Sequence, residues 1–237
     1  MNRHQRRKAE GRGRKATLDP VIAVHEAGHA IARFLAIGDL GGYSEDAAIA
    51  YIEVHTDPAQ AEGRDSFDKK ATLHSQAITC GPRFPKQVSD AVLRLNSGTD
   101  ATLDELTAIF AKARDDGVHI DKWLRAKLFE IVSGPMAEAI FSQQNFWKIW
   151  DSYEAEEDLR AAVENCLLAG IDSDEIQPWI DEAAKRSLET FQRPEVWRAT
   201  RALANSLPVN GRLDGKLAVG IIRGAMTRGT DLTSNPR

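Results

Sequence analysis

Val24-His25-Glu26-Ala27-Gly28-His29-Ala30 lies in a segment with the composition of a buried helix. On a helix, residues four positions apart share a face, so His25 and His29 can direct two imidazoles at one metal ion. Glu26 follows the first histidine, where its carboxylate can reach a metal-bound water without being a ligand itself. The pattern H-E-x-x-H therefore predicts a two-histidine zinc site with a general base, and this site still needs a third ligand.

The surroundings of the motif favour a helix over residues 19–37. Asp19 is a suitable N-cap, Pro20 suits the first helical position, and Gly38 follows as a stop. Apolar residues occur on most sides of this segment, which indicates that the helix is buried. Buried histidines and a buried glutamate need polar partners, and metal coordination would supply them.

The composition is that of an ordinary globular chain of 237 residues, with 42% hydrophobic residues and a net charge of -4. The sequence has no apolar run of the roughly 18 residues that a transmembrane helix needs, so we expect no membrane partner. Cys80 and Cys166 form no CxxC pair, which favours free thiols and a cytoplasmic location. Residues 1–16 form a basic leader that we expect to be disordered. This leader lacks aromatic residues and a recognition motif, which argues against nucleic-acid binding.

The rest of the pattern predicts one mainly α domain over residues 17–230, with a small β element after the first helix. A strand over 48–54 is expected at a sheet edge, either as an ordinary edge strand or as one that pairs with an extended peptide beside the metal. Residues 57–118 form an enlarged insertion. The further helices are expected at 86–95, at 102–114 behind the capping box Thr102–Glu105, at 121–132, at 136–141 after an interruption at Ser133-Gly134-Pro135, and at 153–169, 172–191, 195–206 and 213–226.

The residues alone leave the third ligand open. A histidine six residues after the motif is excluded, because that position is Leu35. His55, His74 and His119 remain available, although each lies in a polar or turn-like stretch. The acidic cluster 154–158 opens a helix whose other face is apolar, so one of its acids can point inward. The preference of acids for a helix N-terminus explains the others.

Three segments resemble the FtsH-type zinc metallopeptidases, and they occur in the order of that family: His25–Ala30, Ser133–Phe141 and Glu157–Leu159. The resemblance covers residues 19–226 and implies a mainly helical, zincin-like peptidase domain. Residues 207–216 resemble the closing helix-turn-helix of the family.

The same resemblance implies the members of the site. His25 and His29 correspond to the histidine ligands, Glu26 to the base, and Asp158 to the aspartate that completes the Zn²⁺ site. Glu138 matches the first glutamate of the family's Ala-Glu-Glu element. It is either a hydrogen-bond partner of a ligand histidine or an acid that packs between helices.

The resemblance implies a zinc-dependent endopeptidase that hydrolyses flexible or unfolded polypeptide. The family attaches this domain to an ATPase module, but no phosphate-binding GxxxxGK[ST] motif occurs here, so we expect a stand-alone, ATP-independent domain. A homo-oligomer is left open. The alternative is a non-catalytic metal-binding protein with an interaction or regulatory role, which would have no need of a base beside two ligand histidines.

Overall fold

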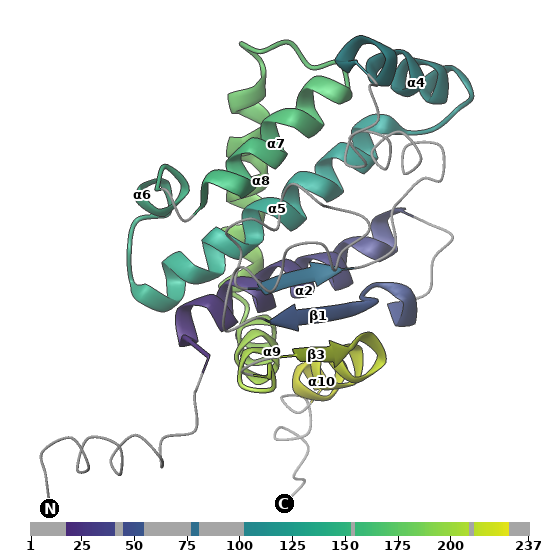
Figure 1. Cartoon of the computed structure of the whole chain (residues 1–237). Helices are drawn as coiled ribbons and strands as arrows, with labels where there is room; N and C mark the ends of the chain where they lie inside the picture. Colours follow the sequence, from purple (N-terminus) through teal and green to yellow (C-terminus); the bar gives the residue numbers. More distant parts are fainter. Residues whose placement is uncertain are drawn as a thin grey trace, which may run out of the picture.

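The computed structural model describes residues 18–40, 45–54, 77–80, 102–152, 155–208 and 211–227. Within these ranges the protein is mainly α-helical with a small antiparallel sheet, which confirms the predicted fold class at this level (Figure 1). The helices are α2 (Pro20–Leu40), α4 (Leu103–Asp115), α5 (Ile120–Ser142), α6 (Phe146–Trp150), α7 (Glu156–Leu168), α8 (Ile176–Phe191), α9 (Pro194–Ala204) and α10 (Gly215–Thr227). The strands are β1 (Tyr51–Val54), β2 (Ala77–Cys80) and β3 (Gly211–Asp214), and a short 3-10 helix, Glu45–Ala47, precedes β1.

Helix α2 carries the H-E-x-x-H motif and begins where the sequence predicts. Asp19 accepts a hydrogen bond from the backbone N–H of Val21 at 2.9 Å, and the helix starts at Pro20. It continues to Leu40, beyond the stop expected at Gly38. A glycine inside a helix costs only about 1 kcal/mol relative to alanine, and Ala36 and Ile37, which come just before Gly38, are buried.

Helix α5 packs antiparallel along α2, so that Glu138 meets His25 at one end and Glu130 meets Arg33 at the other. The expected interruption at Ser133-Gly134-Pro135 is wrong, because α5 runs through all three residues. Proline removes one helical hydrogen bond. Residues 131–137 are nevertheless all buried, and their packing holds the helix together across the proline.

The two helices pack closely at a pair of glycines, Gly28 and Gly134. A Cβ added at Gly28 would lie 2.8 Å from the Cβ of Ala137 and 3.1 Å from the Cα of Gly134, and it would also overlap the carbonyl oxygen of Ser133. Only glycine fits at this position. The close approach brings the side chains on this face of α2 directly against α5.

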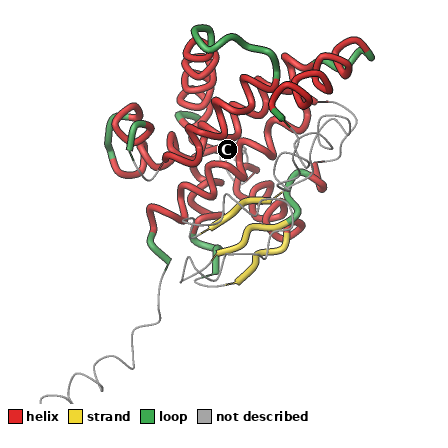
Figure 2. Tube along the Cα trace, turned by 45° about the horizontal axis from the view of Figure 1, so that its top comes forward, coloured by secondary structure: helices red, strands yellow, loops and turns green. Residues whose placement is uncertain are grey.

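The sheet has the strand order β2-β1-β3, with β1 in the centre (Figure 2). Tyr51 lies opposite Cys80 on one side and Asp214 on the other. Both interpretations of segment 48–54 as an edge strand are therefore wrong, because a central strand has no free hydrogen-bonding edge for a peptide. Strand β2 pairs with one side of β1, and β3 pairs with the other side along its whole length.

The C-terminal part also differs from the expectation. The predicted helix over 213–226 is preceded by β3, and α10 begins at Gly215. The closing element is thus a helix, a strand and a second helix, and not a helix-turn-helix. Helix α6 was not predicted, whereas the capping box at Thr102 and Glu105 is confirmed, with both of its hydrogen bonds present.

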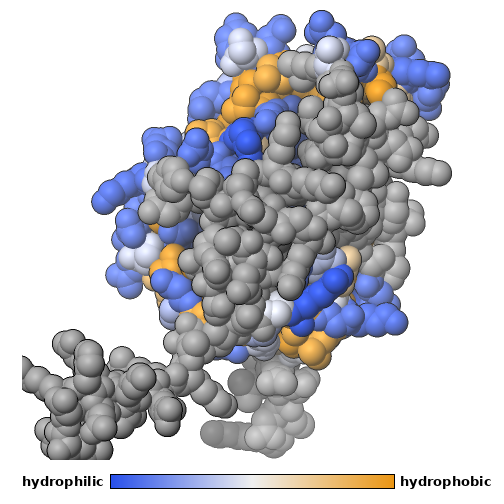
Figure 3. Space-filling view, viewed as in Figure 1, coloured by the Kyte–Doolittle hydropathy of each residue, from blue (hydrophilic) through white to orange (hydrophobic). Residues whose placement is uncertain are grey.

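One large hydrophobic core cluster includes residues of α2, of β1 and β3, and of every described helix from α4 to α10. On the face drawn in Figure 3, the described surface shows small apolar patches among hydrophilic residues. None of the described helices has both the length and the apolar character needed to span a membrane. The predicted leader 1–16, the helix 86–95 and most of the insertion 57–118 lie outside the described residues.

Candidate metal centre

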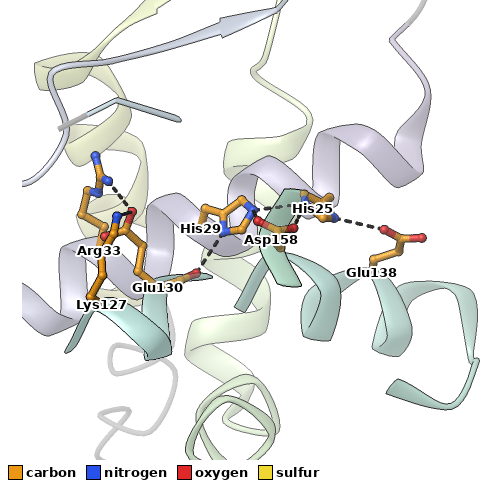
Figure 4. Close-up of polar contacts among 7 residues, drawn as sticks. All are labelled: His25, His29, Arg33, Lys127, Glu130, Glu138 and Asp158. Atoms are coloured by element: carbon orange, nitrogen blue, oxygen red, sulfur yellow. Dashed lines mark hydrogen bonds and ion pairs between the residues drawn. The ribbon is translucent and has the colours of Figure 1, made fainter. Parts of the chain in front are cut away.

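Two helices bring together three side chains of types that can bind a metal (Figure 4). His25 and His29 project from one face of α2, and Asp158 projects toward them from the first turn of α7. The Nε2 atoms of the two histidines are 3.0 Å apart. Asp158 places Oδ2 at 3.1 Å from Nε2 of His25 and Oδ1 at 3.5 Å from Nε2 of His29. These three residues could hold a metal ion.

The separations fit the requirements of a metal ion. Bond lengths of about 2.0–2.1 Å in a tetrahedral zinc site place neighbouring ligand atoms about 3.3–3.4 Å apart. The two Nε2 atoms are 3.0 Å apart, and each lies 3.1 or 3.5 Å from a different oxygen of Asp158. With one ligand atom taken from each residue, all three lie within 4.8 Å of one another, close enough for a single ion to draw them together.

The second nitrogen of each imidazole is held by a group that can only accept a hydrogen bond. Nδ1 of His25 donates to the carboxylate of Glu138 at 3.0 Å, and Nδ1 of His29 donates to the backbone carbonyl of Glu130 at 2.9 Å. Carboxylate and carbonyl oxygens are acceptors, so both Nδ1 atoms carry the hydrogen. With Nδ1 of each ring engaged in this way, Nε2 is the nitrogen that faces Asp158 and the one through which each histidine could bind a metal. Glu138 therefore contacts His25 directly, and its role beside a metal ligand stays a prediction.

The charges of the site favour a bound cation. Burial alone would lower the pKa of His25, but hydrogen bonds to Asp158 and Glu138 and the nearby charge of Glu26 raise it to about 10. Burial would raise the pKa of Asp158, but the two histidines lower it. The metal-free site therefore holds an additional proton on His25, which a metal ion would displace.

Glu26 follows His25 on α2 and is buried, with 7% of its surface exposed. Its negative charge is close enough to contribute to the raised pKa of His25. The side chains of His25, His29 and Asp158 are 16%, 14% and 20% exposed, so the centre is largely enclosed but reaches the surface.

Gly134 of α5 provides the space for the ring of His29. A Cβ at this position would lie 2.8 Å from Cδ2 of His29 and would overlap Nε2 and Cε1 of the same ring. The imidazole is therefore packed between the backbone of α5 and the carboxylate of Asp158.

The other candidates for the third ligand do not join this group. His119 lies at the N-cap position of α5 and is not among the described residues that could hold a metal together. His55 and His74 lie outside the described residues. Sequence reasoning missed Glu130, because a backbone carbonyl leaves no trace in the residue type. It also missed Arg33, although the spacing of four from His29 places it on the ligand face.

Comparisons of this chain with models of protein families, with curated proteins and with solved structures find no match.

Proposed function

We propose that this protein is a zinc-dependent endopeptidase that cleaves flexible or unfolded polypeptide. The observation that carries the proposal is the arrangement of the two imidazoles. Each has its Nδ1–H engaged by an acceptor on α5, and each presents Nε2 to the same carboxylate on α7. The three segments that resemble the FtsH-type peptidases are thus the segments that meet in space.

His25, His29 and Asp158 would hold the metal. Two imidazoles and one carboxylate suit Zn²⁺ better than Mg²⁺ or Ca²⁺, which prefer all-oxygen sites. A zinc ion bound there would lower the pKa of a coordinated water and polarise the scissile carbonyl.

Glu26 would act as the general base and general acid. Its carboxylate takes a proton from the attacking water and then transfers it to the leaving amine. The buried position of Glu26 beside a ligand histidine is consistent with this role. Glu138 and the carbonyl of Glu130 keep the two histidines in the ligating tautomer throughout.

The alternative is a metal site without catalysis, in which the ion joins α2 to α7. The low exposure of the three ligand side chains, 14–20%, favours this alternative, because a substrate needs access to the metal. Glu26 favours the enzyme, because a purely structural site needs no base.

Zinc content and cleavage of unfolded casein would be measured on the wild type, on Glu26→Gln and on Asp158→Ala. We expect Glu26→Gln to keep zinc and lose cleavage, and Asp158→Ala to lose zinc. Glu156→Ala is the matched control, because this acid lies in the same first turn of α7 but is exposed. Full cleavage by Glu26→Gln would refute the catalytic proposal, and full zinc content in Asp158→Ala would refute the ligand assignment.

A further inference from the structure

Glu130 of α5 has two polar groups, its backbone carbonyl and its side-chain carboxylate. Through them it contacts α2, which bears the histidines, and Lys127 on its own helix. Its backbone carbonyl accepts the hydrogen of Nδ1 of His29 at 2.9 Å. Its carboxylate forms an ion pair with Arg33 and accepts a hydrogen bond from Nζ of Lys127 at 3.1 Å. The residue that fixes the tautomer of one ligand is thus itself fixed by two cations.

The two cations lie on the same side of the metal centre, beyond His29 (Figure 4). Arg33 lies one helical turn beyond His29 on the same face of α2, and Lys127 lies one turn before Glu130 on α5. Figure 4 shows Arg33, Lys127 and Glu130 on one side of His29, with Asp158, His25 and Glu138 on the other. From these contacts we propose that Arg33, Lys127 and Glu130 form a positioning cluster, which holds His29 in the orientation that binds the metal.

The burial of the cluster is not explained by stability. The side chains of Arg33 and Glu130 are only 12% and 16% exposed. Within the described residues, Nε and Nη1 of Arg33 are buried and have no hydrogen-bond partner. Unsatisfied buried donors destabilise a protein, and apolar side chains of similar volume often replace a buried ion pair without loss of stability. A requirement for a defined position of α5 against α2 explains why charged residues are found here.

The contacts of Glu130 link the position of its side chain to that of its backbone carbonyl. Arg33 holds the carboxylate against α2, and Lys127 holds it from one turn earlier on α5. Loss of these contacts would free the 127–130 turn of α5 to move away from α2, and the carbonyl of Glu130 would move with it.

The proposal rests on the metal centre but not on peptidase activity, so its test uses no substrate. Zn²⁺ affinity is measured by competition with a chelator. In the metal-free protein, NMR measures how slowly the Nδ1 hydrogen of His29 exchanges with water. A purely structural ion pair would change the unfolding temperature but would leave the exchange in the folded protein unaltered.

The main variant is the double substitution Arg33→Met with Glu130→Gln, which removes both charges and keeps their volume. We expect Zn²⁺ affinity to fall by about tenfold or more, as is usual when the support of a ligand is lost, and the Nδ1 hydrogen to exchange faster. The matched control is Arg125→Met with Glu182→Gln, an exposed ion pair between α5 and α8. This control should bind Zn²⁺ as the wild type does.

Two milder variants decide the matter if the double variant does not fold. Arg33→Lys keeps the charge and should retain more affinity than Arg33→Met. Lys127→Met removes a cation that is 30% exposed and should weaken binding less than the double variant does. Wild-type affinity and wild-type exchange in Lys127→Met and in the double variant, or in whichever of them folds, would overturn the proposal. If the wild type bound no metal, the centre itself would be refuted, whereas the exchange measurement would still test the cluster.

Discussion

Replacing Gly134 with alanine tests whether the space beside His29 is part of the metal centre. The added methyl would lie 2.8 Å from Cδ2 of His29, whereas ordinary contacts of this kind begin at 3.4 Å. The ring must therefore move by at least 0.6 Å at this atom, and by more at Nε2, which lies even closer to the added methyl. Metal–ligand distances tolerate deviations of only about 0.2 Å, so the displaced ring would no longer coordinate well.

Stability and metal affinity are expected to respond differently. Overpacking costs about 1–3 kcal/mol, and the better helix propensity of alanine offsets about 1 kcal/mol of this loss. The free energy of unfolding of the metal-free protein should therefore fall by about 2 kcal/mol at most. Zn²⁺ affinity should fall by about 100-fold, the upper end for a change beside a ligand, because His29 itself is displaced.

The assay is chelator competition for Zn²⁺, together with urea unfolding of the metal-free protein. Gly220→Ala is the matched control, because a Cβ on this glycine of α10 would meet no atom within 4 Å. We expect this control to bind Zn²⁺ normally and to be more stable by about 0.5–1 kcal/mol. Wild-type Zn²⁺ affinity in a folded Gly134→Ala protein would show that the ring of His29 is not held against α5 as described.

Three further predictions concern the partners and the titration of the site. Glu138→Ala should weaken Zn²⁺ binding by about 10–100-fold, because Nδ1 of His25 loses its acceptor, and Glu138→Gln should weaken it less. Equal affinities of the wild type and both variants in a chelator competition would contradict this. Because the pKa of His25 is raised from 6.5 to about 10, its stabilisation of the metal-free protein should be complete below pH 6.5 and lost as the pH rises through 10. Urea unfolding in a chelating buffer measures this loss, and His25→Gln should remove that part of the pH dependence. Burial raises the pKa of the Cys166 thiol to about 11, so in a Cys80→Ser background Cys166 should react with a thiol reagent only after unfolding; rapid reaction of the folded protein would argue against its buried position.

The histidine pair was predictable because it depends only on local geometry. Positions 25 and 29 share a face of any helix that forms there, and the segment has a clear N-cap at Asp19. The pattern of residues pointed to an inward-facing acid in the cluster 154–158, but the choice of Asp158 came from the resemblance to a known family. Its distance of more than a hundred residues from the motif means that no local pattern places it beside His25.

Other features depend on long-range packing and could not be derived from local patterns. Gly134-Pro135 is typical of a helix break, but the contact with α2 keeps the helix continuous. Segment 51–54 has the composition of a strand, and its central position follows from the pairing with β3, which comes about 160 residues later. The support of His29 by the carbonyl of Glu130 is invisible in the sequence, because every residue has a carbonyl.

The glycine contact between α2 and α5 has a consequence for how the protein would respond to the supply of metal. The ligand frame is assembled by packing at Gly28 and Gly134 and by the contacts with Glu138 and Glu130, none of which involves the ion. Small zinc-dependent domains, in contrast, unfold when the ion is removed. We therefore expect a chelator to leave this fold intact, so that zinc can be lost and regained by a protein that never unfolds. Its occupancy would then follow the free zinc concentration of its surroundings, while its lifetime as a folded molecule would not.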